Sequence, residues 1–334
     1  MSVTFTHLIY NLMLLMFVWG MYKAWHSAVR TQTIHPFKAV ALLSLFYLSY
    51  LAFPALVLVI WQIWQGEINW LQFISTSIIL SVLIYARFIE PHQVLVQETK
   101  LSIDPKRPLK HPLKIALIAD LHIGLYSGNE KQLKTIVEKI NEEQPDFVVV
   151  SGDWTYEPEQ TLAQEIAVLQ QIDVPIYSVT GNHDEQYPGP PIQQLLANAL
   201  IENQIKDIEN KVIEFEEICL VGIGDLWAGK ASMDILRALP QNKLILLLSH
   251  NPDTVEMVPP LATKPLMLSG HTHGGQIELP WLTDYVLKKV SILGHKKGYY
   301  MHENANVFVT VGTGMVGAPF RFRVPPTIDI LYLN

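Results

Sequence analysis

The sequence predicts an α/β domain of layered sheets preceded by N-terminal transmembrane helices. Residues 39–86 contain a single charged side chain, Glu67, which is typical of segments that lie within a bilayer. After about residue 112 the pattern changes, and short apolar runs alternate with amphipathic ones. Strands alternating with helices favour a layered α/β fold. We therefore divide the chain into a membrane anchor (residues 1–90), a linker (91–111) and a second domain (112–334).

The composition excludes several classes of protein. Of the 334 residues, 49% are apolar and 16% are charged, which excludes a disordered chain and disfavours a wholly soluble one. The single cysteine, Cys219, excludes a disulfide scaffold and a zinc module built on cysteines. The formal net charge of −7 argues against general nucleic-acid binding, so we expect no nucleic-acid partner.

About three membrane-spanning helices are expected before residue 90, since a span needs about 20 apolar residues. The second run (39–64) carries Pro54, which a membrane helix tolerates as a kink, and a short turn at 65–69 separates it from the third run (70–89). The first run (6–22) is weaker because it contains His7 and Asn11. It lacks the basic start and the clear cleavage site of a signal peptide, so we interpret it as an anchor helix.

The basic residues indicate the orientation of these helices. Lys23, Arg30 and Lys38 lie between the first two runs, and further basic residues lie from Arg87 to Lys114, whereas the turn at 65–69 has none. The positive-inside rule then places both basic segments in the cytoplasm. We expect the N-terminus outside and the second domain facing the cytoplasm.

The second domain is expected to be rich in strands. Helices are expected at 131–141 and 159–171, and residues 212–215 and 218–223 should form a hairpin. The other strands are expected at 114–119, 146–150, 175–179, 244–248, 266–268, 307–311 and 328–333.

Five short polar clusters each follow one of these strands. Parallel strands of an open α/β sheet bring their carboxyl ends to one edge, so clusters far apart in the sequence meet there. Their side chains are His, Asp and Asn, a ligand set for borderline divalent metals. A lone Asp or His at a strand end is usually a turn or surface residue, but five such clusters together favour a metal site. The clusters are Asp120-Leu121-His122, Gly152-Asp153, Gly181-Asn182-His183-Asp184, His250-Asn251-Pro252-Asp253 and Gly270-His271-Thr272-His273-Gly274-Gly275.

The spacing within the clusters supports this interpretation. Asp120 and His122 are two residues apart on a segment expected to be extended, so both side chains should point to one side. His271 and His273 repeat the arrangement. Glycines that precede ligands in three of the clusters permit the sharp turns that aim a side chain over the sheet edge.

In this order the clusters resemble the calcineurin-like metallophosphoesterases. The series D-x-H, G-D, G-N-H-D, H and G-H-T-H-G-G appears over residues 114–275, and Trp154 stands where a second acidic or Asn residue is common after G-D. With its anchor, the chain resembles bacterial transmembrane proteins with a metallophosphoesterase domain, a group that includes membrane phosphodiesterases and UDP-2,3-diacylglucosamine hydrolases. The resemblance implies a layered β-sandwich flanked by helices and a location in the inner (cytoplasmic) membrane.

The resemblance also implies a role for each cluster residue. Two divalent metal ions are expected, with manganese as the first choice and iron or zinc as alternatives. His183 would be the catalytic residue beside the substrate, and Asp184 would either orient it or form a turn. One metal would be held by Asp120, His122 and His273, the other by Asn182, His250 and His271, and Asp153 would bridge both.

The expected function is a membrane-anchored phosphoesterase that hydrolyses a phosphodiester or pyrophosphate bond. Its substrate would be a phosphorylated small molecule or a lipid-linked one, such as UDP-2,3-diacylglucosamine in lipid A biosynthesis. The alternatives are a phosphodiesterase of another substrate, a metal-binding scaffold without turnover, and a transporter or sensor, which the lack of a pattern of intramembrane charges disfavours. Apolar residues near the site either receive acyl chains or belong to the core, namely Trp154, Trp227, Trp281 and Phe320.

Two features near the C-terminus complete the candidates. Arg321 and Arg323 are two apart in an apolar stretch, so both are expected to face one way and bind a phosphate or diphosphate. The alternative is a pair of solvated edge charges. Residues 312–317 match G-x-G-x-x-G, but Pro319 and Pro325-Pro326 prevent the helix that a dinucleotide site requires, so we reject that site.

Overall fold

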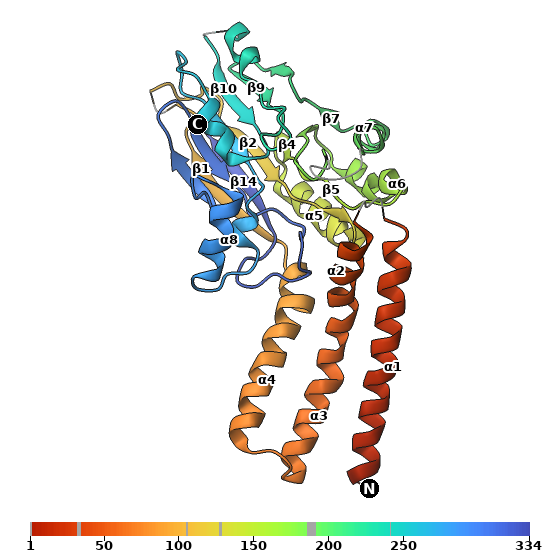
Figure 1. Cartoon of the computed structure of the whole chain (residues 1–334). Coiled ribbons are helices and arrows are strands. Elements are labelled where there is room, and N and C mark those ends of the chain that lie inside the picture. The colour runs from red at the N-terminus through yellow and green to blue at the C-terminus, as the bar shows by residue number, and fades with distance from the viewer. Residues whose placement is uncertain (1, 32–34, 105, 127–128, 186–191, 241) are drawn as a thin grey trace.

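The computed structural model describes residues 2–31, 35–104, 106–126, 129–185, 192–240 and 242–334. Long helices extend from one end of a sheet-rich domain (Figure 1). Three stretches, Thr4–Ala28, Pro36–Gln65 and Trp70–His92, are long and apolar enough to cross a membrane, which confirms the three expected runs. The helices are α1 (Ser2–Ala28), α2 (Pro36–Leu48), α3 (Ala52–Gln65) and α4 (Trp70–Ile84).

Local signals in the sequence shape the helical part. A 3-10 turn (Ser49–Leu51) joins α2 to α3 just before Pro54, which has no N–H to donate to the preceding turn. At the other end of α3, Gly66 takes the left-handed conformation (φ 72°), and Asn69 caps α4 by accepting from the N–H of Gln72. The N-terminus and this turn lie at the same end of the helices, away from the sheets (Figure 1).

Strand β1 (Leu95–Leu101) lies in the segment expected to be a linker, and this corrects the expected boundary. It pairs in parallel with β14 (Thr327–Leu333) along its whole length and forms the edge of a sheet. Polar residues occupy positions 97–100, so the apolar alternation that identifies a strand is weak. The sheet domain therefore begins near residue 95, because a partner at the other end of the chain recruits this segment.

Two six-stranded sheets form the domain, as the layered prediction requires. Their orders are β1-β14-β2-β4-β6-β7 and β12-β13-β11-β10-β9-β8, and the expected hairpin is the antiparallel pair β8–β9. Besides β1 and β14, the first sheet contains β2 (Leu113–Ile118), β4 (Phe147–Ser151), β6 (Ile176–Val179) and β7 (Lys206–Asp207). The second contains β8 (Val212–Glu214), β9 (Ile218–Gly222), β10 (Leu244–Leu248), β11 (Leu266–Ser269), β12 (Gly298–Met301) and β13 (Asn306–Val309). A small third sheet pairs β3 (Ile123–Gly124) with β5 (Thr155–Tyr156).

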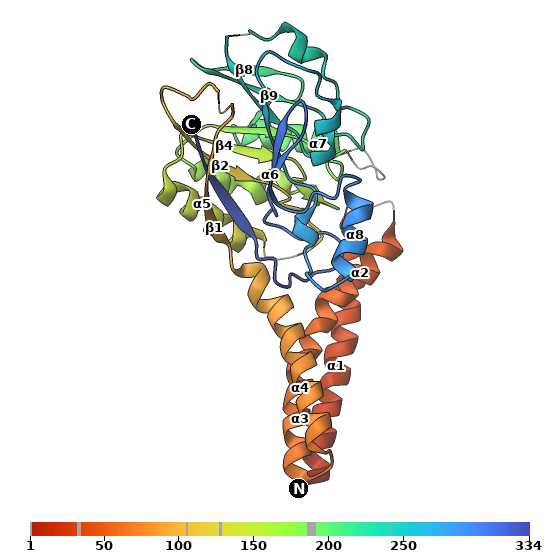
Figure 2. The same cartoon turned by 90° about the vertical axis from the view of Figure 1, so that its left-hand side faces the viewer.

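An apolar core lies between the two large sheets, and further cores cover their outer faces. Leu117 and Val149 of the first sheet share the central core with Leu246 and Leu268 of the second. Helices from α5 to α7 cover the outer face of the first sheet (Figure 2), so the helix-flanked sandwich is confirmed. These helices are α5 (Asn129–Glu143), α6 (Leu162–Ile166) and α7 (Gln193–Glu202).

Three helical details differ from the sequence expectation. The helix expected at 159–171 is the short α6 followed by a 3-10 turn (Ala167–Gln171). Helices α7 and α8 (Leu282–Val290) are not among the predicted elements. Both are shorter than the windows over which helical periodicity becomes clear, so packing rather than local pattern identifies them.

The N-terminal apolar helices also pack against the sheet domain. An apolar cluster joins Leu43 and Phe46 of α2 with Tyr126 and Tyr156 of the sheet domain. The rings of Phe46 and Tyr126 stack with their centroids 5.2 Å apart. The Tyr156 ring in turn lies 5.7 Å from that of His122. The N-terminal helices therefore border the region where the polar clusters converge.

Candidate metal centre

The seven residues expected to hold metal all lie in loops that directly follow strands. The strands are β2, β4 and β6 of the first sheet and β10 and β11 of the second, so both sheets contribute. None of the seven side chains is more than 6% exposed. Such burial of Asp and His is costly unless the groups are paired or bind a cation.

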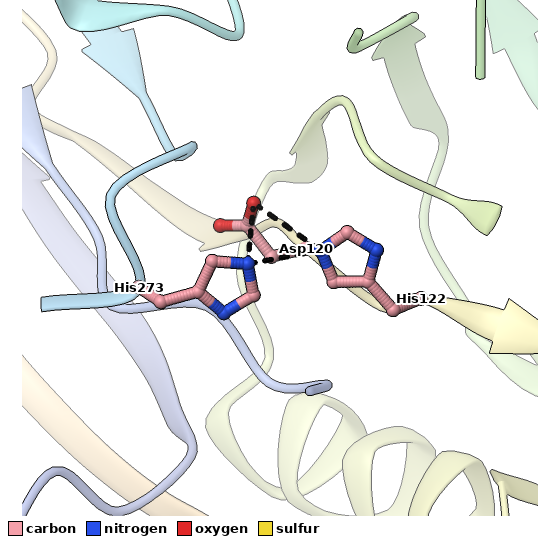
Figure 3. Close-up of side chains that lie close together, drawn as sticks. All are labelled: Asp120, His122 and His273. Carbon is pink, nitrogen blue, oxygen red and sulfur yellow. Dashed lines mark hydrogen bonds and ion pairs between the residues drawn. The ribbon is translucent and has the colours of Figure 1, made fainter. Parts of the chain in front are cut away.

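Asp120, His122 and His273 form the first group (Figure 3). Their ligand atoms all lie within 4.8 Å of one another. Nε2 of His122 is 2.9 Å from Nε2 of His273, which is 3.5 Å from Oδ1 of Asp120. Two imidazoles and a carboxylate around one point are a common ligand set for a divalent transition metal.

Asp153, His250 and His271 form the second group. Nε2 of His250 lies 3.2 Å from Oδ2 of Asp153 and 3.1 Å from Nδ1 of His271. The same Asp153 oxygen is 3.5 Å from Nε2 of His122, in the first group. Asp153 therefore lies between the two groups, where the resemblance places the bridging ligand.

Backbone carbonyls determine which ring nitrogens face the centre. Nδ1 of His122 and Nδ1 of His250 donate to the carbonyls of Thr155 and Ser151, at 3.3 and 2.9 Å. Nε2 of His271 donates to the carbonyl of Val290 at 3.2 Å. A carbonyl only accepts, so in the neutral rings the opposite nitrogens carry lone pairs that point into the centre. This arrangement fits metal ligands, whose second nitrogen is normally held by such a bond.

Asn182 gives independent evidence that the residues of the centre suit a metal ion. Its side-chain oxygen is buried and has no hydrogen-bond partner within the described part of the chain. The next residue, His183, donates its backbone N–H to Oδ1 of Asp153 at 2.9 Å, so this loop lies directly against the proposed bridge. A buried amide oxygen without a partner suits coordination of a divalent cation.

Burial and neighbouring charges also set the protonation of the imidazoles. Burial lowers the pKa of His122 and of His271 to about 3, so both rings are neutral at physiological pH. For His250 burial acts in the same direction, but the adjacent Asp153 carboxylate overrides it and raises the pKa to about 10. A metal that binds His250 must therefore displace a proton.

The ligand loops have strained backbones, which corrects the expectation of extended segments. Asp120, His122, Asp153, His271 and His273 all have left-handed φ, between 47° and 71°. Hydrogen bonds between loops hold this conformation: the N–H groups of Asp120 and His122 donate to the carbonyls of Gly152 and Asp153, at 3.0 and 3.1 Å. Backbone strain maintained by such contacts is a frequent property of functional sites.

Two glycines permit the loops to approach this closely. A Cβ on Gly181 would lie 2.2 Å from a carboxylate oxygen of Asp153. A Cβ on Gly152, whose φ is 81°, would lie 2.9 Å from His250. Any side chain at either position would displace a proposed ligand, so the glycines are part of the site.

His183 lies beside the two groups but is a member of neither. Its ring is half-buried, and its centroid is 5.1 Å from the rings of His122 and Tyr156. Burial lowers the pKa of His183 below its usual value. The structure thus places His183 at the edge of the centre, where the resemblance expects the catalytic residue.

Asp184 fits the turn alternative. Its carboxylate is fully buried and accepts from the backbone N–H groups of Trp154, Thr155 and Gly181, at 3.1, 2.9 and 2.9 Å. These bonds join the loop after β4 to the loop after β6. Asp184 therefore holds together the two loops that carry Asp153 and Asn182.

The expected phosphate-binding pair is corrected by the structure. Arg321 is 0% exposed, and its guanidinium donates to the carbonyls of Val311, Gly312, Gly314 and Val324. Arg323 is exposed instead, and its φ of 63° breaks the alternation that would point both side chains one way. Arg321 therefore supports the loop at 311–314, and only Arg323 is a surface charge.

Sequence reasoning missed one buried carboxylate near the centre. Asp225 is fully buried, accepts from the N–H of Ala228 with one oxygen at 2.8 Å, and has no partner for the other among the described residues. Its charge contributes to the raised pKa of His250. The signal was present, since Gly224-Asp225 follows an expected strand just as Gly152-Asp153 does.

The order and geometry of these residues define a class of protein. Residues 113–296 match the family described as calcineurin-like phosphoesterase, and the chain belongs to that family. Family membership supports the hydrolysis of phosphoric esters, and the two ligand groups are consistent with two divalent metals.

Three relatives show the range of similar proteins. The uncharacterized metallophosphoesterase YkuE of Bacillus subtilis (strain 168) is 29% identical over 75% of this chain and 89% of its own length. The transmembrane protein with metallophosphoesterase domain of Danio rerio is 31% identical over 72% of this chain and 57% of its own length. Phosphodiesterase YaeI of Escherichia coli (strain K12) is 30% identical over 66% of this chain and 82% of its own length.

Replacing Arg321 or Arg323 by methionine should change the stability of the folded protein by very different amounts. Arg321→Met leaves several buried carbonyls without a donor, which should cost about 3–5 kcal/mol and lower the thermal midpoint by roughly 10 °C. Arg323→Met, the matched control, should change stability by less than about 0.5 kcal/mol because its side chain is exposed. Thermal unfolding of the purified full chain measures both. Equal midpoints for the two variants would contradict the supporting role of Arg321.

Proposed function

We propose that the protein is a membrane-anchored, two-metal phosphoesterase that hydrolyses a phosphodiester or pyrophosphate bond. One observation carries the proposal: two buried groups of histidine and carboxylate meet at Asp153, a member of the second group that also lies 3.5 Å from His122 of the first, in a domain of the phosphoesterase family. The complete ligand set favours turnover over the alternative of a metal-binding scaffold.

The two groups of side chains support a division of the ligands between two metals. Asp120, His122 and His273 would hold one ion, Asn182, His250 and His271 the other, with Asp153 on both. Two divalent ions, when bound, would supply Lewis acidity to the phosphoryl group and to the attacking water. The mixed nitrogen and oxygen ligands suit manganese, with iron or zinc as alternatives.

His183 would act on the leaving group. It is half-buried at the edge of the centre, and its backbone is held by Asp153. From this position the ring would protonate the departing oxygen or stabilise the charge that develops there. Its ring packs edge-to-face against the rings of His122 and Tyr156, with centroids 5.1 Å apart in both pairs.

The substrate would be lipid-linked. Support comes from the apolar helices, which pack through Phe46 against the loops of the centre and so keep it close to the bilayer. UDP-2,3-diacylglucosamine, in lipid A biosynthesis, is the sharpest candidate. Of the tryptophans considered as acyl contacts, Trp154 is a core residue whose Nε1 donates to Ser178, whereas Trp227 and Trp281 are exposed. A phosphodiester without lipid is the alternative, and a relative named phosphodiesterase favours it.

The catalytic domain would face the cytoplasm from a multi-pass inner membrane protein. The N-terminus and the α3–α4 turn share one end of the helices, and the basic segments lie at the other end with the sheet domain (Figure 1). The positive-inside rule assigns that second end to the cytoplasm.

Reporter fusions test this topology. Fusions after Arg30, Glu67 and Lys110 should report inside, outside and inside, because the basic segments flank the first and last positions. Paired cytoplasmic and periplasmic reporters at each site measure the result. A periplasmic signal after Lys110 would contradict the cytoplasmic placement.

Replacement of the proposed bridge tests the function itself. Purified protein loaded with Mn²⁺ should hydrolyse one or more of bis-p-nitrophenyl phosphate, p-nitrophenyl phosphate and UDP-2,3-diacylglucosamine. Asp153→Asn should abolish this turnover and reduce bound metal, because one carboxylate holds both ions in register. Metal analysis and initial rates measure the two effects.

An exposed carboxylate provides the control for that experiment. Asp234→Asn removes the same charge at a surface position, next to Arg237, and should keep both metals and full turnover. Full activity with two metals in Asp153→Asn would overturn the two-metal proposal. Two bound metals in the unaltered chain without turnover of any substrate would favour the scaffold.

His183→Ala should separate acid catalysis from metal binding. Both metals should remain, and kcat should fall by about 10²–10⁴-fold on a substrate with a poor alkoxide or sugar leaving group. The loss should be much smaller with nitrophenolate, which needs no proton to depart. Equal losses on both substrates, with metals intact, would assign His183 to charge stabilisation instead. Loss of a metal would make it a ligand.

A further inference from the structure

Helix α8 and the loops beside it expose an unusual amount of apolar surface. Trp281 is 86% exposed and Ile292 is 92% exposed, although both belong to the sheet domain. Clusters of large exposed apolar side chains on a protein mark interaction surfaces. We call this surface the α8 face, and it consists of Leu279, Trp281, Leu282, Tyr285, Val286, Ile292 and Leu293.

The charge of the α8 face is opposite to that of the chain. Residues 278–297 contain four lysines and two acidic residues, Glu278 and Asp284, a net charge of +2, whereas the whole chain has −7; one of the lysines, Lys296, is paired with Glu278 at 2.9 Å. Lys288, Lys289 and Lys297 are exposed, and Nζ of Lys289 lies 4.4 Å from the centre of the Tyr285 ring. Lysines around Trp, Tyr and Ile are typical of a surface that enters an anionic membrane interface.

The α8 face is continuous with the membrane-side helices. The N–H of Arg321 donates to the carbonyl of Ala86, within the third membrane-length stretch, at 2.9 Å. Phe322, the next residue along, pairs with Ile277 and accepts from the N–H of Glu278 at 2.8 Å. The chain then leads directly into α8. Both views show α8 on the part of the sheet domain nearest to the helices (Figures 1 and 2).

The α8 face also borders the metal centre. Val290, the last residue of α8, accepts the hydrogen bond from Nε2 of His271. A cavity of about 260 Å³ lies beside both the helix and the centre. Its lining includes His271 and His273 of the centre and Leu282 and Val286 of α8. An acyl chain would find apolar walls here within reach of the proposed ligands.

We propose that the α8 face docks into the anionic surface of the lipid bilayer and that this cavity admits the acyl part of a membrane-embedded phosphoester. The lysines contact headgroups, Trp281 and Tyr285 lie at the interface, and Ile292 enters the acyl region. Docking rests on the surface itself, whereas the choice of substrate rests on the proposed phosphoesterase function.

Spin labelling of the full chain in lipid nanodiscs tests the docking. In a Cys219→Ser background, a nitroxide on Ile292→Cys should be accessible to oxygen and protected from a water-soluble nickel complex. A nitroxide on Ile201→Cys, at a site 74% exposed on α7 and farther from the helices in Figures 1 and 2, should be accessible to nickel. Discs of phosphatidylcholine with phosphatidylglycerol should protect Ile292→Cys more than phosphatidylcholine alone, and high salt should reduce the difference.

Other outcomes would overturn the docking. Equal access of the nickel complex to the nitroxides at positions 292 and 201 would show that the α8 face lies in water. Broadening of the Ile292→Cys spectrum by a second nitroxide would show that another copy of the chain covers the face. Full protection that does not depend on lipid charge would remove the role of the lysines.

A comparison of substrates tests whether docking of the α8 face delivers a lipid-linked substrate to the centre. Ile292→Glu should lower the ratio of turnover on UDP-2,3-diacylglucosamine in discs to turnover on bis-p-nitrophenyl phosphate by about tenfold, the loss expected when one apolar side chain leaves a membrane. Ile201→Glu should leave that ratio unchanged. An unchanged ratio in Ile292→Glu would overturn the substrate route. If the protein hydrolyses neither compound but the nitroxide at 292 is protected by lipid, the proposed function fails while the docking stands.

Discussion

The metal centre depends on one constraint, which is that buried nitrogen and carboxylate ligands packed this closely need a cation, a proton or a metal ion, between them. Nitrogens of His250 and His271 face each other at 3.1 Å, with a carboxylate oxygen of Asp153 beside them. Five cluster residues also hold left-handed backbones, at about 1–2 kcal/mol for each residue. Hydrogen bonds between loops, and the absence of side chains at Gly152 and Gly181, maintain this strain. Folding of the loops and binding of the metals are therefore linked.

A second layer of contacts supports this constrained centre. Arg321 donates to carbonyls of the loop at 311–314, and this loop donates in turn to the main-chain carbonyl of Asp120. Glu90, at the end of the third membrane-length stretch, accepts from the backbone N–H of Val324. Hydrogen bonds thus run from the end of the third apolar helix to the main chain of a proposed ligand. The N-terminal helices are therefore part of the support of the site.

The fold also places apolar surface beside the proposed metal centre. The cavity next to His271 and His273 is also lined by residues of α8, and the carbonyl of Val290 determines which His271 nitrogen faces the centre. A displacement of α8 would alter that hydrogen bond. The surface that would meet lipid and the geometry that would perform chemistry are therefore physically coupled.

The sequence by itself determined what depends on neighbours in the chain. Apolar length identified the helices, short apolar runs identified most strands, and the polar residues after those strands identified the members of the centre. Only the tertiary structure decided what depends on distant segments. β1 becomes a strand because β14 pairs with it, and Arg321 is buried because carbonyls up to ten residues before it converge on its guanidinium. Hydrogen bonds and burial between remote segments leave no local periodicity, so the linker and the arginine pair were misread.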